Sequence, residues 1–264
     1  MAVSPQHFTQ VEGLRLQFRL RGEGPPLLML HGWGTSSLSF MGASLRIEKR
    51  FRTLVPDLPG FGFSEMPPEP WGAADYARTV ASLLESAAFG PCDVLGHSFG
   101  GLVATALATS RPDLVNRLVL VASPVVRLPP AAGVRARNRT YVMVRRLATL
   151  LPPFRERILD WGRLRYGSED YRNAGAMRPT MVRVLGENWL DALHSVKAPT
   201  LLIYGEKDED VPLAVAHAAI EALPKGAELV VVPGAGHFPF LDDTDAFVEA
   251  LSTFLLPAGA RTDA

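Results

Sequence analysis

The chain has 264 residues, 47% of them hydrophobic, and its 27 basic and 27 acidic side chains give a formal net charge of zero. This length suits one domain with a sizeable core and an insertion, while the balanced charge excludes a general electrostatic attraction to nucleic acid or to a membrane surface. The single cysteine, Cys92, excludes a disulfide within the chain and fits a reducing, cytoplasmic compartment.

We expect neither a secretory signal nor a membrane span in this sequence. The first ten residues show no basic-then-apolar signal sequence, and no run approaches the roughly 18 apolar residues of a membrane span.

Residues 14–20 alternate apolar and polar side chains, which predicts an outer, half-exposed strand.

Further along, short apolar runs predict strands that are buried on both faces, as in a parallel sheet. They lie at residues 27–30, 53–55, 92–95, 118–121, 200–204 and 229–232. Amphipathic stretches that predict helices separate several of them, at residues 73–88, 102–110, 213–223 and 245–255. This alternation predicts an α/β fold with helices on both faces of the sheet, in which ligands bind beyond the carboxyl ends of the strands.

Residues 124–196 interrupt the alternation with prolines and short helical pieces. We expect a helical cap there, inserted into a core of residues 1–123 and 197–256, with residues 257–264 as a disordered tail. Thirteen arginines between Arg127 and Arg183 make the segment basic. With its aromatic residues it could receive an anionic acyl substrate or dock an acidic carrier. The alternative is that most of these arginines lie on solvated helix faces.

The most informative motif is Gly-x-Ser-x-Gly at residues 96–100, between a predicted strand and a predicted helix. A serine there must turn the chain sharply, so that the hydroxyl of Ser98 stands free at the end of the sheet. The flanking glycines lack the Cβ atoms that would collide in such a turn. A serine hydroxyl becomes a useful nucleophile only beside a base, an acid that orients the base, and an oxyanion site.

Candidates for these three parts follow other predicted strands. His237 is the candidate base, in a glycine-rich loop after residues 229–232. The acid should follow residues 200–204, where four carboxylates occur and spacing alone does not choose among them. They are Glu206, Asp208, Glu209 and Asp210.

The oxyanion site needs two backbone N–H groups. Phe99, directly after the serine, supplies one by the geometry of the turn. The second is expected from Trp33 in the loop His31-Gly32-Trp33-Gly34. We expect His31 to hold this loop by hydrogen bonds or to line the pocket, and not to transfer a proton in the reaction.

These motifs together resemble the α/β-hydrolase fold family, and the resemblance covers almost the whole chain. It rests on residues 31–34, 57–64, 96–101, 205–208 and 236–237. The resemblance implies an eight-stranded, mostly parallel sheet with a helical cap after the sixth strand. It also implies that Ser98, Asp208 and His237 are nucleophile, acid and base. The core is similar to small carboxylesterases of the pimeloyl-ester type, although His97 stands where that type usually carries Trp.

We therefore expect a carboxylesterase of class EC 3.1.1 that cleaves esters of small or medium acyl groups. Two alternatives stay open: hydrolysis of a carbon–carbon bond in a 1,3-dicarbonyl compound, and a receptor-like member with little turnover. Neither a metal-ligand cluster nor a complete dinucleotide fingerprint is present in the sequence, so no cofactor is expected. A monomer or homodimer is expected. The candidate pocket residues are His31, Trp161, Tyr166, Trp189 and Phe238.

Overall fold

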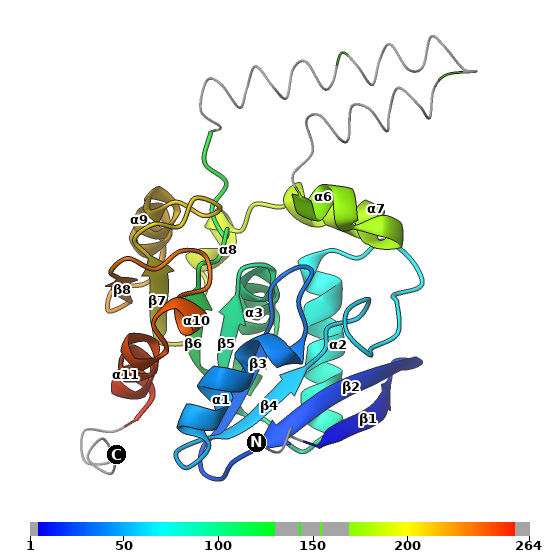
Figure 1. The fold of residues 1–264 in the computed structure, drawn as a ribbon, viewed down its shortest axis with the longest axis horizontal. Coiled ribbons are helices and arrows are strands. Elements are labelled where there is room, and N and C mark those ends of the chain that lie inside the picture. Colours follow the sequence, from blue (N-terminus) through cyan, green and yellow to red (C-terminus); the bar gives the residue numbers. More distant parts are fainter. Residues whose placement is uncertain (1–4, 130–142, 144–153, 155–168, 257–264) are drawn as a thin grey trace. The chain divides into compact units, whose positions relative to one another are not determined.

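The computed structural model describes residues 5–129, 143, 154 and 169–256 (Figure 1). By its internal contacts the chain divides into two compact units. The larger contains Met1–Arg127 and Gly186–Ala264, and the smaller is Leu128–Leu185. Each unit is described by itself below.

Eight strands form one mixed sheet in the larger unit, in the order β1-β2-β4-β3-β5-β6-β7-β8. β2 pairs antiparallel with β1 and β4, whereas all the other neighbours are parallel. This confirms the predicted fold class, an α/β fold with an eight-stranded and mostly parallel sheet. The strands are β1 Gln6–Val11, β2 Leu14–Arg21, β3 Pro26–Leu30, β4 Arg52–Pro56, β5 Cys92–His97, β6 Val115–Val121, β7 Thr200–Gly205 and β8 Glu228–Val232.

Helices cover both faces of this sheet (Figure 1). On one face α1 Met41–Ile47 packs with α10 Pro239–Asp242 and α11 Thr244–Leu255. On the other face α2 Ala73–Ser86 packs on α3 Phe99–Ser110, which contacts α8 Leu190–Leu193, and α8 contacts α9 Leu213–Ala222. Two short 3-10 turns, η1 Ser37–Phe40 and η2 Pro112–Leu114, precede α1 and β6. Every residue of β5 and β7 is buried, as expected for parallel strands covered on both sides.

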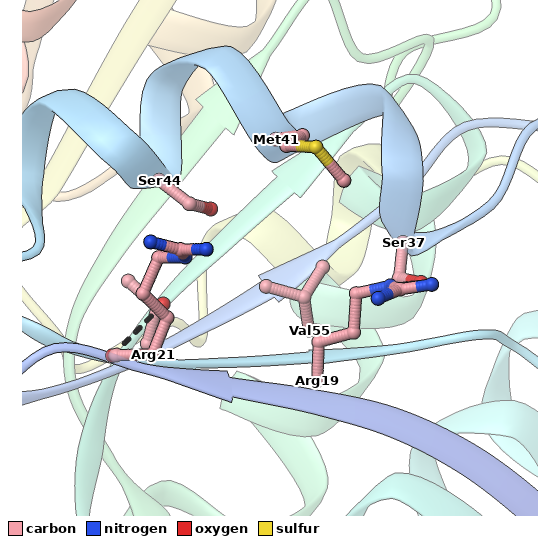
Figure 2. Close-up of a pocket in the computed structure, with 7 residues that line it drawn as sticks. Arg19, Arg21, Ser37, Met41, Ser44 and Val55 are labelled. Carbon is pink, nitrogen blue, oxygen red and sulfur yellow. Dashed lines mark hydrogen bonds between the residues drawn. The ribbon is translucent and has the colours of Figure 1, made fainter. Parts of the chain in front are cut away.

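The prediction for residues 14–20 was wrong in its position, because β2 lies inside the sheet and β1 forms the edge. The polar face of β2 is buried as well: Gln17 is 0% and Arg19 is 5% exposed. η1 covers this face and supplies a partner, since Arg19 Nε donates to Ser37 Oγ at 3.2 Å. Figure 2 shows two arginines of this face, Arg19 and Arg21, at a small pocket beside α1.

The described part of the smaller unit is helical. It contains α6 Glu169–Asn173, η4 Gly175–Met177 and α7 Arg178–Leu185. Over residues 128–129, 143, 154 and 169–185 no strand occurs. Among all described residues of the chain, no helix has the length and apolar character needed to cross a bilayer.

The chain leaves and re-enters the larger unit at one place. Arg127 donates its backbone N–H to Asn188 Oδ1 at 3.2 Å and a guanidinium N–H to the Gly186 carbonyl at 3.4 Å. The N–H of Trp189 donates to the Val125 carbonyl at 3.0 Å. These bonds hold the two ends of the intervening segment side by side.

Candidate active site

Ser98 stands in the sharp turn between β5 and α3. Its backbone has φ +50° and ψ −116°, a conformation that L residues rarely adopt and that surrounding structure must enforce. A Cβ on Gly100 would lie 2.2 Å from the Leu30 carbonyl oxygen, so the turn packs against β3 more closely than a larger residue allows. The Ser98 N–H donates to the Val121 carbonyl at 2.9 Å, which fixes the turn to β6 as well.

His237 lies in the loop after β8, and its Nε2 is 3.0 Å from Ser98 Oγ. Two carboxylates hold this loop through its glycine N–H groups. Gly234 donates to Glu206 and Gly236 donates to Asp242, each at 2.8 Å. The imidazole is therefore carried by an anchored loop.

Asp208 lies in the loop after β7, and its Oδ2 accepts from His237 Nδ1 at 2.9 Å. Its other oxygen accepts from the N–H groups of Asp210 at 2.9 Å and Val211 at 2.8 Å. The Asp208 side chain is 0% exposed, so all its acceptor capacity faces the protein. Because a carboxylate accepts at Nδ1, that nitrogen carries the proton and Nε2 presents its lone pair to the serine hydroxyl.

The structure thus distinguishes the four candidate carboxylates by contact. Asp208 reaches His237, whereas Glu206 bonds to the Gly234 N–H. Ligand atoms of Asp208, Asp210 and His237 lie within 4.8 Å of one another, a spacing that could hold a metal ion. In the structure, however, Asp208 Oδ2 and His237 Nδ1 already satisfy each other, and Asp208 Oδ1 accepts two backbone bonds. We therefore describe the group as a hydrogen-bonded acid–imidazole pair.

The two N–H groups expected to form the oxyanion site come from different loops. Phe99 begins α3, directly after the serine. The loop that carries Trp33 also reaches the serine, because a Cβ on Gly32 would lie 3.3 Å from the Ser98 Cβ. Within the described residues, neither the Phe99 N–H nor the Trp33 N–H has a hydrogen-bond acceptor. Their rings pack edge to face, with centroids 5.4 Å apart.

His31 holds loops together. Its Nδ1 donates to the Gly32 carbonyl at 2.8 Å, and its Nε2 accepts from the Leu58 N–H at 2.9 Å. Desolvation of this fully buried ring lowers the pKa of His31 to about 4, so the imidazole stays neutral. With 0% exposure and both nitrogens on backbone groups, the ring links the 31–34 loop to the 57–64 loop.

The other expected pocket residues lie in different surroundings. Trp189 is half-buried, and its Nε1 donates to Glu187 at 3.1 Å. Phe238 is half-buried beside the site, with its ring 5.3 Å from that of His237. Trp161 and Tyr166 lie outside the described residues, as does most of the arginine-rich segment.

The sequence assigned no role to His97 beyond its departure from the residue usual in similar esterases. In the structure His97 is 1% exposed, and its Nε2 donates to the backbone carbonyl of His237 at 2.8 Å. Its position next to Ser98 marked it in the sequence, but that position did not show which loop the ring would reach.

A family model described as "Alpha/beta hydrolase family" matches residues 27–250. The chain belongs to this family, which identifies it as a hydrolase.

Two relatives represent different chemistries at the same level of similarity. The chain is 30% identical to a 2-hydroxymuconate semialdehyde hydrolase of Pseudomonas sp., over 94% of this chain and 93% of that protein. It is also 30% identical to a pimeloyl-[acyl-carrier protein] methyl ester esterase of Aliivibrio fischeri, over 91% and 97%. Among solved structures, a thermophilic esterase from Thermogutta terrifontis matches with a TM-score of 0.71 and 25% identity, over 98% of this chain and 100% of the other.

Proposed function

We propose that the protein is a serine hydrolase that cleaves carboxylic esters of small or medium acyl groups through an acyl-enzyme on Ser98. The observation that carries this proposal is the continuous hydrogen-bonded chain from Ser98 Oγ to His237 at 3.0 Å and on to Asp208 at 2.9 Å. Three segments far apart in the sequence converge there in the hydrogen-bonded arrangement that nucleophilic catalysis needs.

In the first half of the reaction, Ser98 Oγ forms a bond to the ester carbonyl carbon while its proton passes to His237 Nε2. The carbonyl π electrons move onto oxygen, and the N–H groups of Trp33 and Phe99 stabilise that charge. When the oxyanion collapses, the bond from carbon to the alkoxy oxygen breaks. His237 gives its proton to this oxygen, so the alcohol leaves and the acyl group stays on the serine.

Water repeats the sequence in the second half. His237 takes a proton from water as the water oxygen attacks the acyl carbon, and then returns the proton to Ser98 Oγ as the carboxylic acid departs. In both halves Asp208 keeps the proton on Nδ1 and stabilises the imidazolium that forms. Its two backbone donors keep this carboxylate in one orientation.

Ester cleavage is supported by the similarity to the methyl ester esterase and to the thermophilic esterase. A second candidate is hydrolysis of a carbon–carbon bond in a 1,3-dicarbonyl compound or its vinylogue, favoured by the equal identity to the 2-hydroxymuconate semialdehyde hydrolase. The same acyl-enzyme serves both, since only the leaving group differs: an alkoxide oxygen or an enolate carbon takes the proton from His237.

The test is a panel of p-nitrophenyl esters graded by acyl length, run beside a vinylogous diketone on wild type and on Ser98→Ala. We expect saturable ester turnover in wild type and none above background in the folded variant. Faster cleavage of the diketone than of every ester would transfer the proposal to the second candidate. Labelling of Ser98 by a fluorophosphonate without multiple turnover on either class would favour the receptor-like alternative.

A further inference from the structure

His97 lies between two loops of the site, and each of its ring nitrogens faces one of them. Nε2 donates to the His237 carbonyl at 2.8 Å, and since a carbonyl only accepts, the proton of the neutral ring must be on Nε2. Nδ1 then carries a lone pair, and within the described residues it has no hydrogen-bond partner although it is buried. A Cβ on Gly32 would lie 2.8 Å from Nδ1, so this edge is packed against the oxyanion loop.

Aromatic rings surround the same imidazole and exclude water. The centroids of the His237, Phe238 and Phe240 rings each lie 4.9 Å from that of His97. This desolvation, together with the neighbouring His237, lowers the pKa of His97 to about 3. A protonated ring would keep the hydrogen bond from Nε2 to the His237 carbonyl. The neutral state is therefore set by burial and not by this hydrogen bond.

We propose that His97 is a positioning residue for the reaction, which fixes the main chain of His237 to the nucleophile turn through its Nε2–H. Ser98 follows His97 directly, so this bond joins the backbone that carries the nucleophile to the backbone that carries the base. This bond adds to the 3.0 Å contact between the Ser98 and His237 side chains. It also fixes the position of the His237 main chain, from which the imidazole extends. The inference rests on the proposed function for its kinetic consequence, but not for its geometry.

Substitution of His97 by two amide residues distinguishes the effect of the hydrogen bond from the effect of the ring's volume. The side-chain nitrogen of glutamine lies as many bonds from Cβ as Nε2 of histidine, whereas that of asparagine corresponds to Nδ1. We expect His97→Gln to retain turnover within a few-fold of wild type. His97→Asn and His97→Leu should lower kcat by about 10- to 100-fold with KM nearly unchanged, because a misplaced base affects the transition state and not substrate binding. The control is His217→Leu, which removes an exposed histidine on α9 and should behave as wild type.

The rate at which a fluorophosphonate labels Ser98 should fall in the same order. This readout decides the inference even if no ester is turned over, so it separates the failure of this proposal from the failure of the proposed function. Nitrogen-15 NMR of the histidines gives a readout on the unaltered protein, where His97 should show the Nε2–H tautomer and no titration between about pH 5 and 9. Equal labelling of the Gln and Asn variants, or an Nδ1–H tautomer at His97, would overturn the proposal.

Discussion

An oxygen of the Asp57 carboxylate occupies the space that a side chain at Gly62 would need, because a Cβ there would lie 2.0 Å from Asp57 Oδ2. The same carboxylate accepts from the N–H groups of Ser37 at 2.7 Å and Phe63 at 2.8 Å. Asp57 is 1% exposed, so the 57–64 loop folds around a buried charge that is satisfied by main-chain donors. This loop also contacts the site, since the Leu58 N–H donates to His31.

Gly62→Ala should therefore destabilise the protein by about 3 to 5 kcal/mol. The residue has φ +55°, which an alanine tolerates poorly, and the new methyl group would displace a buried carboxylate from its donors. Urea unfolding measures the change. Gly13→Ala is the matched control, because its φ of +82° carries the backbone strain without any atom within 4 Å. Equal losses in the two variants would mean that the Asp57 contact is unimportant.

Asp208→Asn should lower kcat by about 10³- to 10⁴-fold, because an amide can donate to Nδ1 and place the imidazole in the tautomer with its proton facing the serine. Asp210→Asn should change kcat by less than about ten-fold, because the Asp210 carboxylate lies near the pair but only its backbone N–H is hydrogen-bonded to Asp208. Steady-state kinetics on the best ester compares the two. A larger loss in the Asp210 variant would show that Asp208 is not the catalytic acid.

Asp93 predicts a pH-dependent stability. Among the described residues, one of its oxygens is buried without a hydrogen-bond partner and the other is 3.9 Å from Arg117. Desolvation raises the pKa of the carboxyl to about 6 from its ordinary 3.8, against the opposing effect of the Arg117 charge and backbone N–H. Between these two values the folded state binds more protons than the unfolded state, so wild-type stability falls as pH rises through that window. Above about pH 6 the native protein keeps a buried carboxylate that is poorly compensated.

Asp93→Asn removes this ionisation and should be more stable than wild type at pH 8, by at most about 3 kcal/mol. The advantage should disappear near pH 4, where the wild-type carboxyl is protonated in the folded protein. Urea unfolding at both pH values gives the difference, and Glu249→Gln on the exposed side of α11 serves as control. A gain that is the same at pH 4 and pH 8 would contradict the raised pKa.

The arginine-rich segment predicts a salt effect on charged substrates. If the segment attracts an anionic acyl group, kcat/KM for an ester with a free terminal carboxylate should fall as salt rises from about 0.01 to 1 M. A neutral ester of the same length should show little change over that range. Equal salt dependence of the two substrates would indicate that the thirteen arginines lie on solvated faces and do not attract the substrate.

The parallel strands could be predicted because each contains a short apolar run. The expectation of burial on both faces was wrong for β8, which ends the sheet and has only Val232 buried. β1 was not predicted, because its exposed residues alternate with half-buried ones and leave little apolar signal. The position of β2 was misjudged for a related reason: its polar residues indicate solvent, yet Ser37 and Asp57 sit over that face and form a buried hydrogen-bond network with it.

The site shows a similar division. Ser98 and His237 could be placed together because each follows a parallel strand, and the carboxyl ends of parallel strands lie on the same side of the sheet. Four acidic residues in one loop could not be ranked by spacing, since only the folded loop shows which carboxylate turns inward and accepts from its own backbone. The role of His97 depends on a main-chain carbonyl 140 residues away, and no sequence pattern encodes such a partner.

The paired bonds between Arg127, Gly186 and Asn188 have a consequence for how this protein can diversify. Because the segment leaves and re-enters the larger unit at these bonds, it can be exchanged for one of another length or composition. The strands on either side then keep their register. Ser98, Asp208 and His237 all lie in the larger unit, outside the exchanged segment. Chimeras joined at these bonds would therefore inherit the reactive centre unchanged.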